Sequence, residues 1–379
     1  MKNILIAKPS NDIYLQNRQD RSKTDLQSSE ILAFVKAINY TALVTHPGFR
    51  SDAKIYLVNS FATCMSNNIT LATSKELKSK FHNLHQQSWE GQAAIDEVKS
   101  NFTSRDVFFI FCGVWDLAKI QNLQIIEFAR QFPGTVYYVQ NDLRLDMPEE
   151  LKPYVSKILT QATKKNKENG REYMALDFLP AFYVEQQMQV PHEYDIAVPF
   201  MNWTDMGEYR RRNILSLIRS YGDEQNIKRL IIGPREQIEE LHMHGSFMFQ
   251  KGCTFLPTVK HNELVKTMRK SKASYIISEH IYIENGLTPN RVMEALLSGV
   301  IPVVEANTLD SFNPDILSMY GGYFYYDHTC LSGGLDFHKV IDDRALYEQQ
   351  QLTAQLHSDC EVRWRMLKYI TDNFAKFVI

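Results

Sequence analysis

Short apolar runs that alternate with amphipathic helical patterns restrict the fold of this 379-residue chain more than any other feature. In the first half, strands are predicted at residues 4–7, 42–45, 55–58, 107–112 and 136–139, and helices at 28–37 and 123–130, with the polar segment 73–104 also helical. In the second half, strands are predicted at 195–198, 228–232, 275–278 and 300–304, and helices at 206–220, 261–270, 345–357 and 362–377. Strands that alternate with helices form parallel sheets covered on both faces, with ligands outside the carboxyl ends of the strands. The pattern therefore predicts an α/β protein.

The organisation changes near residue 190. The polar segment Gln186–Glu193 contains Pro191 and is the best linker candidate. We expect one domain over residues 1–187, a second over 194–360, and a helix over 361–379 that packs back on the first. Two Rossmann-like domains facing across a cleft are the layout of sugar-nucleotide-dependent transferases of the GT-B type. The fingerprint G-x-G-x-x-G is absent from both halves, which weakens an NAD interpretation.

Composition narrows the class of protein. Hydrophobic residues make up 44% of the chain and charged residues 23%, and no apolar run approaches the roughly 20 residues of a membrane helix. The first residues lack a signal-peptide pattern, so we expect a cytoplasmic protein. The five cysteines form no close pair, which argues against a disulfide framework. Because the net charge is −2, any contact with nucleic acid depends on local basic clusters. There are three candidate clusters, at residues 164–171, 210–212 and 266–272, and a solvated helix face is the commoner explanation for any one of them.

The segment Asn285–Glu305 carries the strongest chemical pattern. Thr288 is a candidate N-cap with Pro289 at the first helical position, and an apolar strand follows the helix. Arg291 and Glu294 are three residues apart and share a face. A cation at a helix N-terminus favours an anion, and a carboxylate one turn deeper accepts hydrogen bonds from neighbouring sugar hydroxyls, so a diphosphate and a ribose fit. An ordinary surface ion pair explains the same pattern.

Several segments, in the same order along the chain, resemble the DNA β-glucosyltransferase family of T-even bacteriophages. They are Ser28–Glu30 before an apolar helix, Tyr56–Ser60, the closest short match Val136–Leu145, the turn Gly233–Glu236 and the Arg-x-x-Glu helix Arg291–Glu294. The resemblance implies inverting transfer of a sugar, first choice glucose from UDP-glucose, to 5-hydroxymethylcytosine that is turned out of double-stranded DNA. It also implies a monomer in which the first domain binds DNA and the second the nucleotide sugar, in the cytoplasm of an infected bacterium.

Family residues transfer to positions of this chain. Asp142 matches the catalytic base, although its position in the sequence alone favours a turn aspartate that caps the next segment. Arg144 either orients Asp142, holds a DNA phosphate or pairs with Asp146. Glu294 would bind the ribose, and the other donor-binding candidates are Glu30, Arg210, Arg211, Gly233, Tyr282 and Arg291. Lys164 and Lys165 are candidates for DNA binding.

Other functions remain open. The same chemistry would serve another donor such as UDP-arabinose, and the same fold would serve a glycan or small-molecule acceptor. A sugar-nucleotide binding or epimerase-like protein is the alternative from a different class. No Asp-x-Asp motif has a convincing context, so no metal ligands are assigned, although a divalent ion such as Mg²⁺ assists some family members.

Overall fold

A computed structural model describes residues 3–8, 33–38, 40–41, 44–45, 55–59, 84–87, 100, 102–113, 119–164, 170–184, 190–199, 228–236, 253–257, 259, 261–305, 308, 311–316, 325–327 and 361–378. Residue contacts divide the chain into two compact units. Unit 1 comprises Met1–Gln161, Lys165–Leu179 and Lys368–Ile379. Unit 2 comprises Ala162–Lys164 and Pro180–Leu367.

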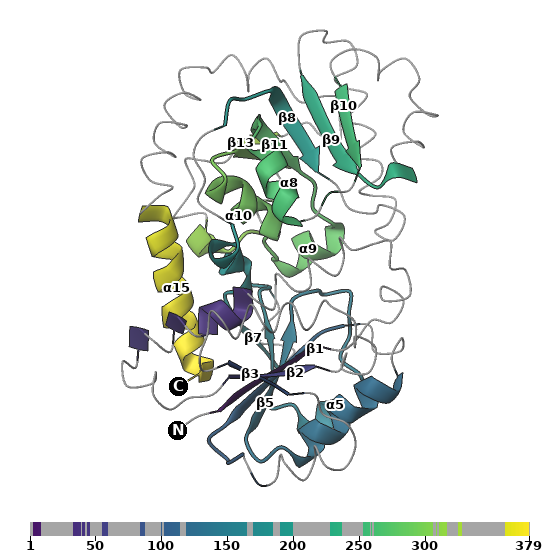
Figure 1. The fold of residues 1–379 in the computed structure, drawn as a ribbon, viewed down its shortest axis with the longest axis vertical. Coiled ribbons are helices and arrows are strands. Elements are labelled where there is room, and N and C mark those ends of the chain that lie inside the picture. Colours follow the sequence, from purple (N-terminus) through teal and green to yellow (C-terminus); the bar gives the residue numbers. More distant parts are fainter. Residues whose placement is uncertain are drawn as a thin grey trace. The chain divides into compact units, whose positions relative to one another are not determined.

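Unit 1 is built on a seven-stranded sheet with the order β3-β2-β1-β4-β5-β6-β7 (Figure 1). Its strands are β1 (Ile4–Lys8), β2 (Ile55–Asn59), β3 (Leu84–Gln87), β4 (Val107–Phe111), β5 (Thr135–Gln140), β6 (Lys157–Thr160) and β7 (Arg171–Tyr173). All neighbouring strands are parallel. The carboxyl ends of all seven strands therefore lie at one edge of the sheet, where ligands of open α/β sheets bind.

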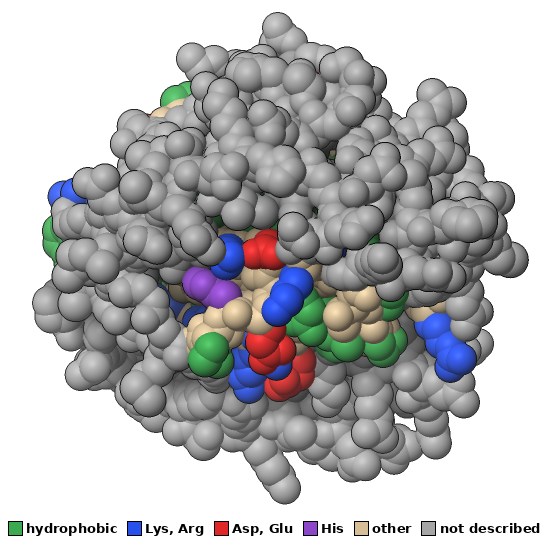
Figure 2. All heavy atoms as spheres, turned by 90° about the horizontal axis from the view of Figure 1, so that it is seen from above, with side chains coloured by type: hydrophobic (Ala, Val, Ile, Leu, Met, Phe, Trp, Pro, Cys, Tyr) green, Lys and Arg blue, Asp and Glu red, His purple; other side chains and the backbone are tan. Residues whose placement is uncertain are grey.

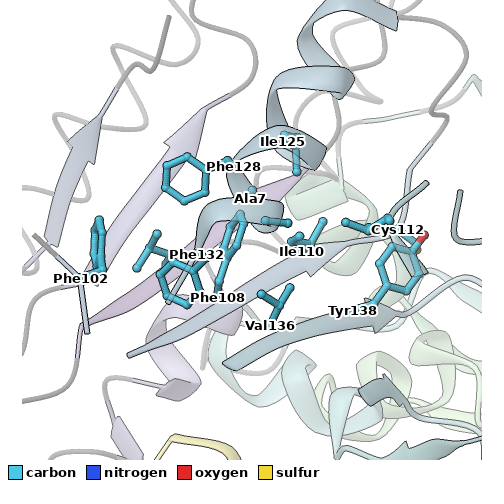
Figure 3. Close-up of a cluster of buried hydrophobic side chains, with 13 residues drawn as sticks. Ala7, Phe102, Phe108, Ile110, Cys112, Ile125, Phe128, Phe132, Val136 and Tyr138 are labelled. Carbon is cyan, nitrogen blue, oxygen red and sulfur yellow. The ribbon is translucent and has the colours of Figure 1, made fainter. Parts of the chain in front are cut away.

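The first face of this sheet is covered by helix α5 (Lys119–Gln131). All side chains of the central strand β4 are buried, and successive ones point to opposite faces. Phe108 and Ile110 pack beneath α5, where the rings of Phe108 and Phe128 lie 5.3 Å apart (Figure 3). Burying one such side chain stabilises the fold by roughly 1.5–3 kcal/mol, so this cluster fixes α5 on the sheet.

The opposite face is covered by the helical segment 33–38 and by helix α15 (Glu361–Val378). Phe34 meets Phe109 and Phe111 edge to face, with ring centroids 5.2 and 4.8 Å apart. Phe374 of α15 contacts Phe34 at 5.7 Å. The last part of α15 therefore belongs to the core of unit 1.

Unit 2 contains a parallel six-stranded sheet with the order β10-β9-β8-β11-β12-β13 (Figure 1). Its strands are β8 (Tyr194–Pro199), β9 (Arg229–Gly233), β10 (Cys253–Pro257), β11 (Ser271–Ile276), β12 (Ile301–Glu305) and β13 (Tyr325–Asp327). The described helices are α8 (His261–Met268), α9 (His280–Asn285) and α10 (Asn290–Leu297). The described parts of the chain also contain the short 3₁₀ helices η2 (Lys152–Tyr154) and η4 (Leu176–Phe182).

Helix α10 shows how the sequence makes one αβ unit. Val292, Met293 and Ala295 are fully buried, and α10 contacts β11, β12 and α8. Gly299 adopts the left-handed conformation with φ 70°, which ends the helix and turns the chain into β12. Since α10 runs antiparallel to the strand that follows it, its N-terminus lies at the carboxyl edge of the sheet.

Three sequence predictions of secondary structure are wrong. Residues 44 and 45 are helical rather than part of a strand, and the helical backbone lets the hydroxyls of Thr41 and Thr45 donate to carbonyls one turn back, at 2.8 and 2.7 Å. The segment 73–104 contains β3, which lies at the end of the sheet and so carries polar side chains. Strand β11 begins at Ser271 and ends at Ile276 rather than running from Tyr275 to Ser278, because small buried serines disguise its start. No helix in the described residues is long and apolar enough to span a bilayer.

Candidate active site

Asp142 follows β5 directly and lies at the carboxyl edge of the unit 1 sheet. The preceding residue, Asn141, accepts a hydrogen bond from the thiol of Cys112 at 2.9 Å. Cys112 itself follows β4, the neighbour of β5. The ends of two adjacent strands are thus tied together beside Asp142.

The turn that carries Asp142 is fastened to β5 by two of that strand's own side chains. The Tyr138 hydroxyl donates to the carbonyl of Asp146 at 3.3 Å, and Gln140 Nε2 donates to the carbonyl of Leu145 at 3.2 Å. The N–H of Leu145 in turn donates to the carbonyl of Asp142 at 3.2 Å. Both β5 side chains are buried, so the backbone at Asp142 is held in one conformation.

The Asp142 carboxylate is oriented by Arg144. Oδ1 accepts from the Arg144 backbone N–H at 3.0 Å and from Nε at 2.9 Å, and Oδ2 accepts from Nη2 at 2.6 Å. The two side chains are 23% and 34% exposed, so the pair is reachable from solvent. Each carboxylate oxygen offers about two acceptor sites, which leaves the remaining site on Oδ2. The structure thus shows Arg144 hydrogen-bonded to Asp142, and a contact between Arg144 and a DNA phosphate stays a prediction.

The start of helix α10 differs from the prediction. Pro289 is the N-cap residue and Asn290 the first helical residue, and no side chain caps the helix. Thr288, the predicted cap, is fully buried and accepts the backbone N–H of Asn313 at 3.1 Å. Because its hydroxyl has this long-range partner, the first N–H groups of α10 have no side-chain acceptor and can bind an anion.

Arg291 and Glu294 form a pair on the first turns of α10. Arg291 Nη1 donates to Glu294 Oε2, and the Tyr183 hydroxyl donates to Glu294 Oε1 at 2.6 Å. The Arg291 side chain is 20% exposed and that of Glu294 only 3%. A buried carboxylate costs several kcal/mol unless it is paired and hydrogen-bonded. The pair is therefore an organised buried group rather than an ordinary surface ion pair.

Two further polar atoms at this edge have no hydrogen-bond partner among the described residues. They are Ser278 Oγ, beyond the end of β11, and Asn290 Oδ1 at the first position of α10. Buried polar atoms are nearly always satisfied in native proteins. Ser278 Oγ can donate to an anionic oxygen, whereas Asn290 Oδ1 only accepts, so the two atoms together indicate a place for a polar ligand that carries hydroxyls as well as negative charge.

Lys164 lies against the C-terminal end of α9. The backbone N–H groups of Thr163 and Lys164 donate to the carbonyls of Gly286 and Asn285 at 2.9 and 3.0 Å. Lys164 Nζ lies 3.4 Å from the carbonyl of Ile283. A cation at a helix C-terminus is favourable, so Lys164 has a structural contact besides any contact with DNA.

The remaining predicted residues divide into two groups. Gly233 ends β9 at the carboxyl edge of the unit 2 sheet, and Tyr282 lies in α9, where its N–H donates to the carbonyl of Glu279 at 2.9 Å. Four predicted residues lie outside the described parts of the chain: Glu30, Lys165, Arg210 and Arg211.

The basic cluster at residues 266–272 is largely ion-paired. Lys270 pairs with Glu193 at 2.9 Å and Lys272 with Asp195 at 2.6 Å, where β8 and β11 begin. Partial burial and the charge of Lys272 lower the pKa of the neighbouring His192. Figure 2 shows basic and acidic side chains next to each other, with a histidine, on one face of the molecule. Since β8 and β11 begin at this cluster, it lies at the edge of the unit 2 sheet opposite the carboxyl ends of the strands. The cluster is therefore not a free phosphate-binding patch.

Sequence reasoning missed Tyr183 and the two β5 side chains that fasten the turn, Tyr138 and Gln140. Tyr183 is 111 positions from its partner Glu294, and no spacing rule connects them. The sequence gives a weak indication of the roles of Gln140 and Tyr138. Side chains that can donate hydrogen bonds are rarely buried at the end of a strand unless the fold supplies acceptors for them.

Comparison with solved structures shows likeness over the whole chain. A DNA-modifying β-glucosyltransferase matches with a TM-score of 0.62 and 14% identity, covering 100% of this chain and 99% of the other. An α-glucosyltransferase in complex with UDP and a 13-mer DNA matches with a TM-score of 0.58 and 13% identity, covering 98% and 100%. A lipopolysaccharide outer-core galactosyltransferase matches at 0.54 and 11%, covering 99% and 100%. A scan against family models gives no match, and neither does a search of curated protein sequences.

At these identities the likeness establishes the fold. The chain has the α/β fold with two parallel sheets that is found in GT-B glycosyltransferases, as the alternation of strands and helices predicts. Function must be argued from the site, since one fold supports many activities.

Proposed function

We propose that this protein is an inverting glycosyltransferase that moves glucose from UDP-glucose onto 5-hydroxymethylcytosine in double-stranded DNA. The proposal is carried by what each unit contains: unit 1 has an oriented carboxylate at the carboxyl edge of its sheet, and unit 2 has an uncapped helix with Arg291 and Glu294 at the carboxyl edge of its own sheet. The full-length likeness to a DNA β-glucosyltransferase and to an α-glucosyltransferase bound to UDP and DNA supports this choice of chemistry.

Unit 2 would bind the donor. Departure of UDP accumulates negative charge on the diphosphate, which fixed positive groups stabilise. Arg291 and the free N–H groups of α10 would hold the diphosphate, and Glu294 would accept the ribose hydroxyls. The other proposed donor contacts are Glu30, Arg210, Arg211, Gly233 and Tyr282.

Unit 1 would bind the acceptor and supply the base. A primary hydroxyl needs a base to attack at neutral pH. In the proposed step the hydroxymethyl oxygen bonds to C1 of the sugar, its proton passes to Asp142, and the bond from C1 to the diphosphate breaks. Because two of the three Arg144 donors bind Oδ1, Oδ2 is the oxygen with room for the incoming proton.

DNA contacts would come from Arg144, Lys164 and Lys165, whose phosphate contacts would weaken with salt. Reaching a base inside the duplex requires turning it out at a cost of a few kcal/mol. Such a reaction belongs to a phage protein that acts, as a monomer, in the cytoplasm of an infected bacterium.

Metal ions enter the proposal only as helpers. T4 phage BGT has been solved with UDP and Mn²⁺, so Mg²⁺ or Mn²⁺ would accompany the diphosphate. The described residues contain no group of three or more His, Cys, Asp or Glu side chains that could hold a metal.

A second candidate keeps the chemistry and changes a substrate. The likeness to a lipopolysaccharide galactosyltransferase favours a glycan acceptor, and another donor such as UDP-arabinose would use the same diphosphate site. A protein that only binds or epimerises sugar nucleotides would leave every acceptor unchanged.

One experiment separates these candidates. Duplex DNA containing 5-hydroxymethylcytosine is incubated with the protein and each of several UDP-sugars, and the released nucleosides are weighed by mass spectrometry. A hexose increment with UDP-glucose is the expected result, and a pentose increment would name another donor. No increment with any donor would reject DNA modification.

The base assignment is tested with Asp142→Asn, which should abolish the increment while UDP binding, followed by calorimetry, stays within about threefold of wild type. Asp372→Asn is the matched control, because this aspartate is exposed on α15. A fully active Asp142→Asn protein would remove Asp142 from the mechanism.

A further inference from the structure

We propose that Tyr183 is a positioning residue for nucleotide recognition. It fixes the rotation of the Glu294 carboxylate, so that this group accepts both ribose hydroxyls and the protein prefers UDP to 2′-deoxy-UDP. The inference rests on the proposed function, because it assumes that Glu294 binds the ribose of the UDP-sugar donor.

The argument starts from the two oxygens of Glu294. Tyr183 donates to Oε1 at 2.6 Å, whereas Arg291 donates to Oε2. A donor on each oxygen fixes the plane of the carboxylate, whereas a donor on one oxygen leaves the group free to rotate about its last bond. The Glu294 side chain is only 3% exposed, so water does not replace a missing donor easily.

Tyr183 is itself held on a fixed backbone. Its N–H donates to the carbonyl of Pro180 at 3.2 Å, and the N–H of Val184 donates to the same carbonyl at 2.9 Å. The carbonyl of Val184 accepts from Arg363 Nη2, and the Val184 side chain is buried. The phenol therefore reaches Glu294 from a rigid segment, which is what a positioning group requires.

The consequence differs between two nucleotides. Two neighbouring ribose hydroxyls can bind one carboxylate only when both of its oxygens lie in the plane of the two hydroxyls. Their binding therefore depends on the rotation of the Glu294 carboxylate. A 2′-deoxyribose presents one hydroxyl, and a carboxylate that rotates still meets it. A hydrogen bond to a charged group is worth roughly a 10- to 100-fold change in affinity. Removing the Tyr183 hydroxyl should cost UDP about tenfold more than it costs 2′-deoxy-UDP.

The test is calorimetric titration of the full-length protein with UDP and with 2′-deoxy-UDP, for wild type and Tyr183→Phe. Wild type should prefer UDP, and in Tyr183→Phe this preference should fall about tenfold. Tyr173→Phe is the matched control, because the Tyr173 hydroxyl also donates to a carboxylate, Asp177 Oδ1 at 2.9 Å, within unit 1. This control should keep the wild-type preference even if its melting temperature falls.

The failures are distinguishable. A Tyr183→Phe protein that binds UDP with the full wild-type preference would overturn the positioning role and leave the proposed function standing. An equal loss for both nucleotides would also overturn it, because a structural role weakens the site without discrimination. A wild-type protein that binds neither nucleotide would overturn the proposed function and this inference together.

Discussion

Gly286 is a position where a single methyl group should be costly, because the backbone conformation and the neighbouring atoms both oppose it. Its φ is +70°, and a Cβ there would lie 2.5 Å from Thr163 Oγ1 and 2.9 Å from the Lys164 nitrogen. Both neighbours are tied down, since Thr163 donates twice to the Gly286 carbonyl at 2.9 Å and Lys164 donates to the Asn285 carbonyl at 3.0 Å. Gly286→Ala therefore cannot be accommodated by moving a flexible side chain end.

The magnitude follows from two contributions. An L-residue in the left-handed conformation costs about 1–2 kcal/mol. Displacing the segment 163–164 removes one to three hydrogen bonds worth about 1 kcal/mol each, so the total loss in the free energy of unfolding is about 2–5 kcal/mol. Gly299 offers a matched control, because its φ is also +70° and nothing lies within 4 Å of the added Cβ. Gly299→Ala should cost only about 1 kcal/mol.

Urea denaturation of both variants measures the difference, and hydrogen exchange locates it. The amides of Thr163 and Lys164 should lose protection in Gly286→Ala and keep it in Gly299→Ala. Equal destabilisation by the two substitutions would refute the reasoning, because the cost would then be conformational alone. Unchanged protection of the two amides in Gly286→Ala would refute it as well.

Two further predictions concern unit 1. Asp106 is fully buried and accepts the backbone N–H groups of Asn3 at 2.5 Å and Thr103 at 2.6 Å, so Asp106→Ala should lower the free energy of unfolding in urea by about 2–4 kcal/mol. A loss below about 0.5 kcal/mol would contradict this account. Burial, followed by the charge of Asp177, raises the pKa of Tyr173 well above its ordinary value. The unfolded chain then releases the phenol proton first, so stability should fall as the pH rises above about 10, and Tyr173→Phe should flatten this alkaline decline in thermal melting. An identical decline in the variant would assign the effect to other groups.

The interior strands of both sheets were predicted except β6, whereas none of the edge strands was predicted. Strands β1, β4 and β5 have neighbours on both sides, so burial on both faces leaves a continuous apolar run in the sequence. The four end strands β3, β7, β10 and β13 were all missed. An edge strand needs few apolar residues and tolerates charge, so its sequence resembles a loop.

The same contrast between local and distant partners holds for the site. Arg291 and Glu294 could be paired from the sequence because three residues in a helix fix their separation. The capping role of Thr288 was a local prediction that failed, since the hydroxyl binds Asn313, 25 positions away. Tyr183 could not be found at all, because only the folded chain brings its hydroxyl to Glu294.

The two carboxylates of the proposed reaction are oriented by the same principle in different surroundings. Asp142 and Glu294 each accept donors on both oxygens, which fixes the plane of each group. Asp142 receives its donors from a residue two positions away, and its side chain stays 23% exposed. A group that exchanges a proton with an incoming substrate must be reachable in this way. Glu294 receives one donor from 111 positions away and is 3% exposed, which suits a group that binds without reacting. Exposure, rather than the number of donors, therefore separates the proposed base from the proposed binding residue.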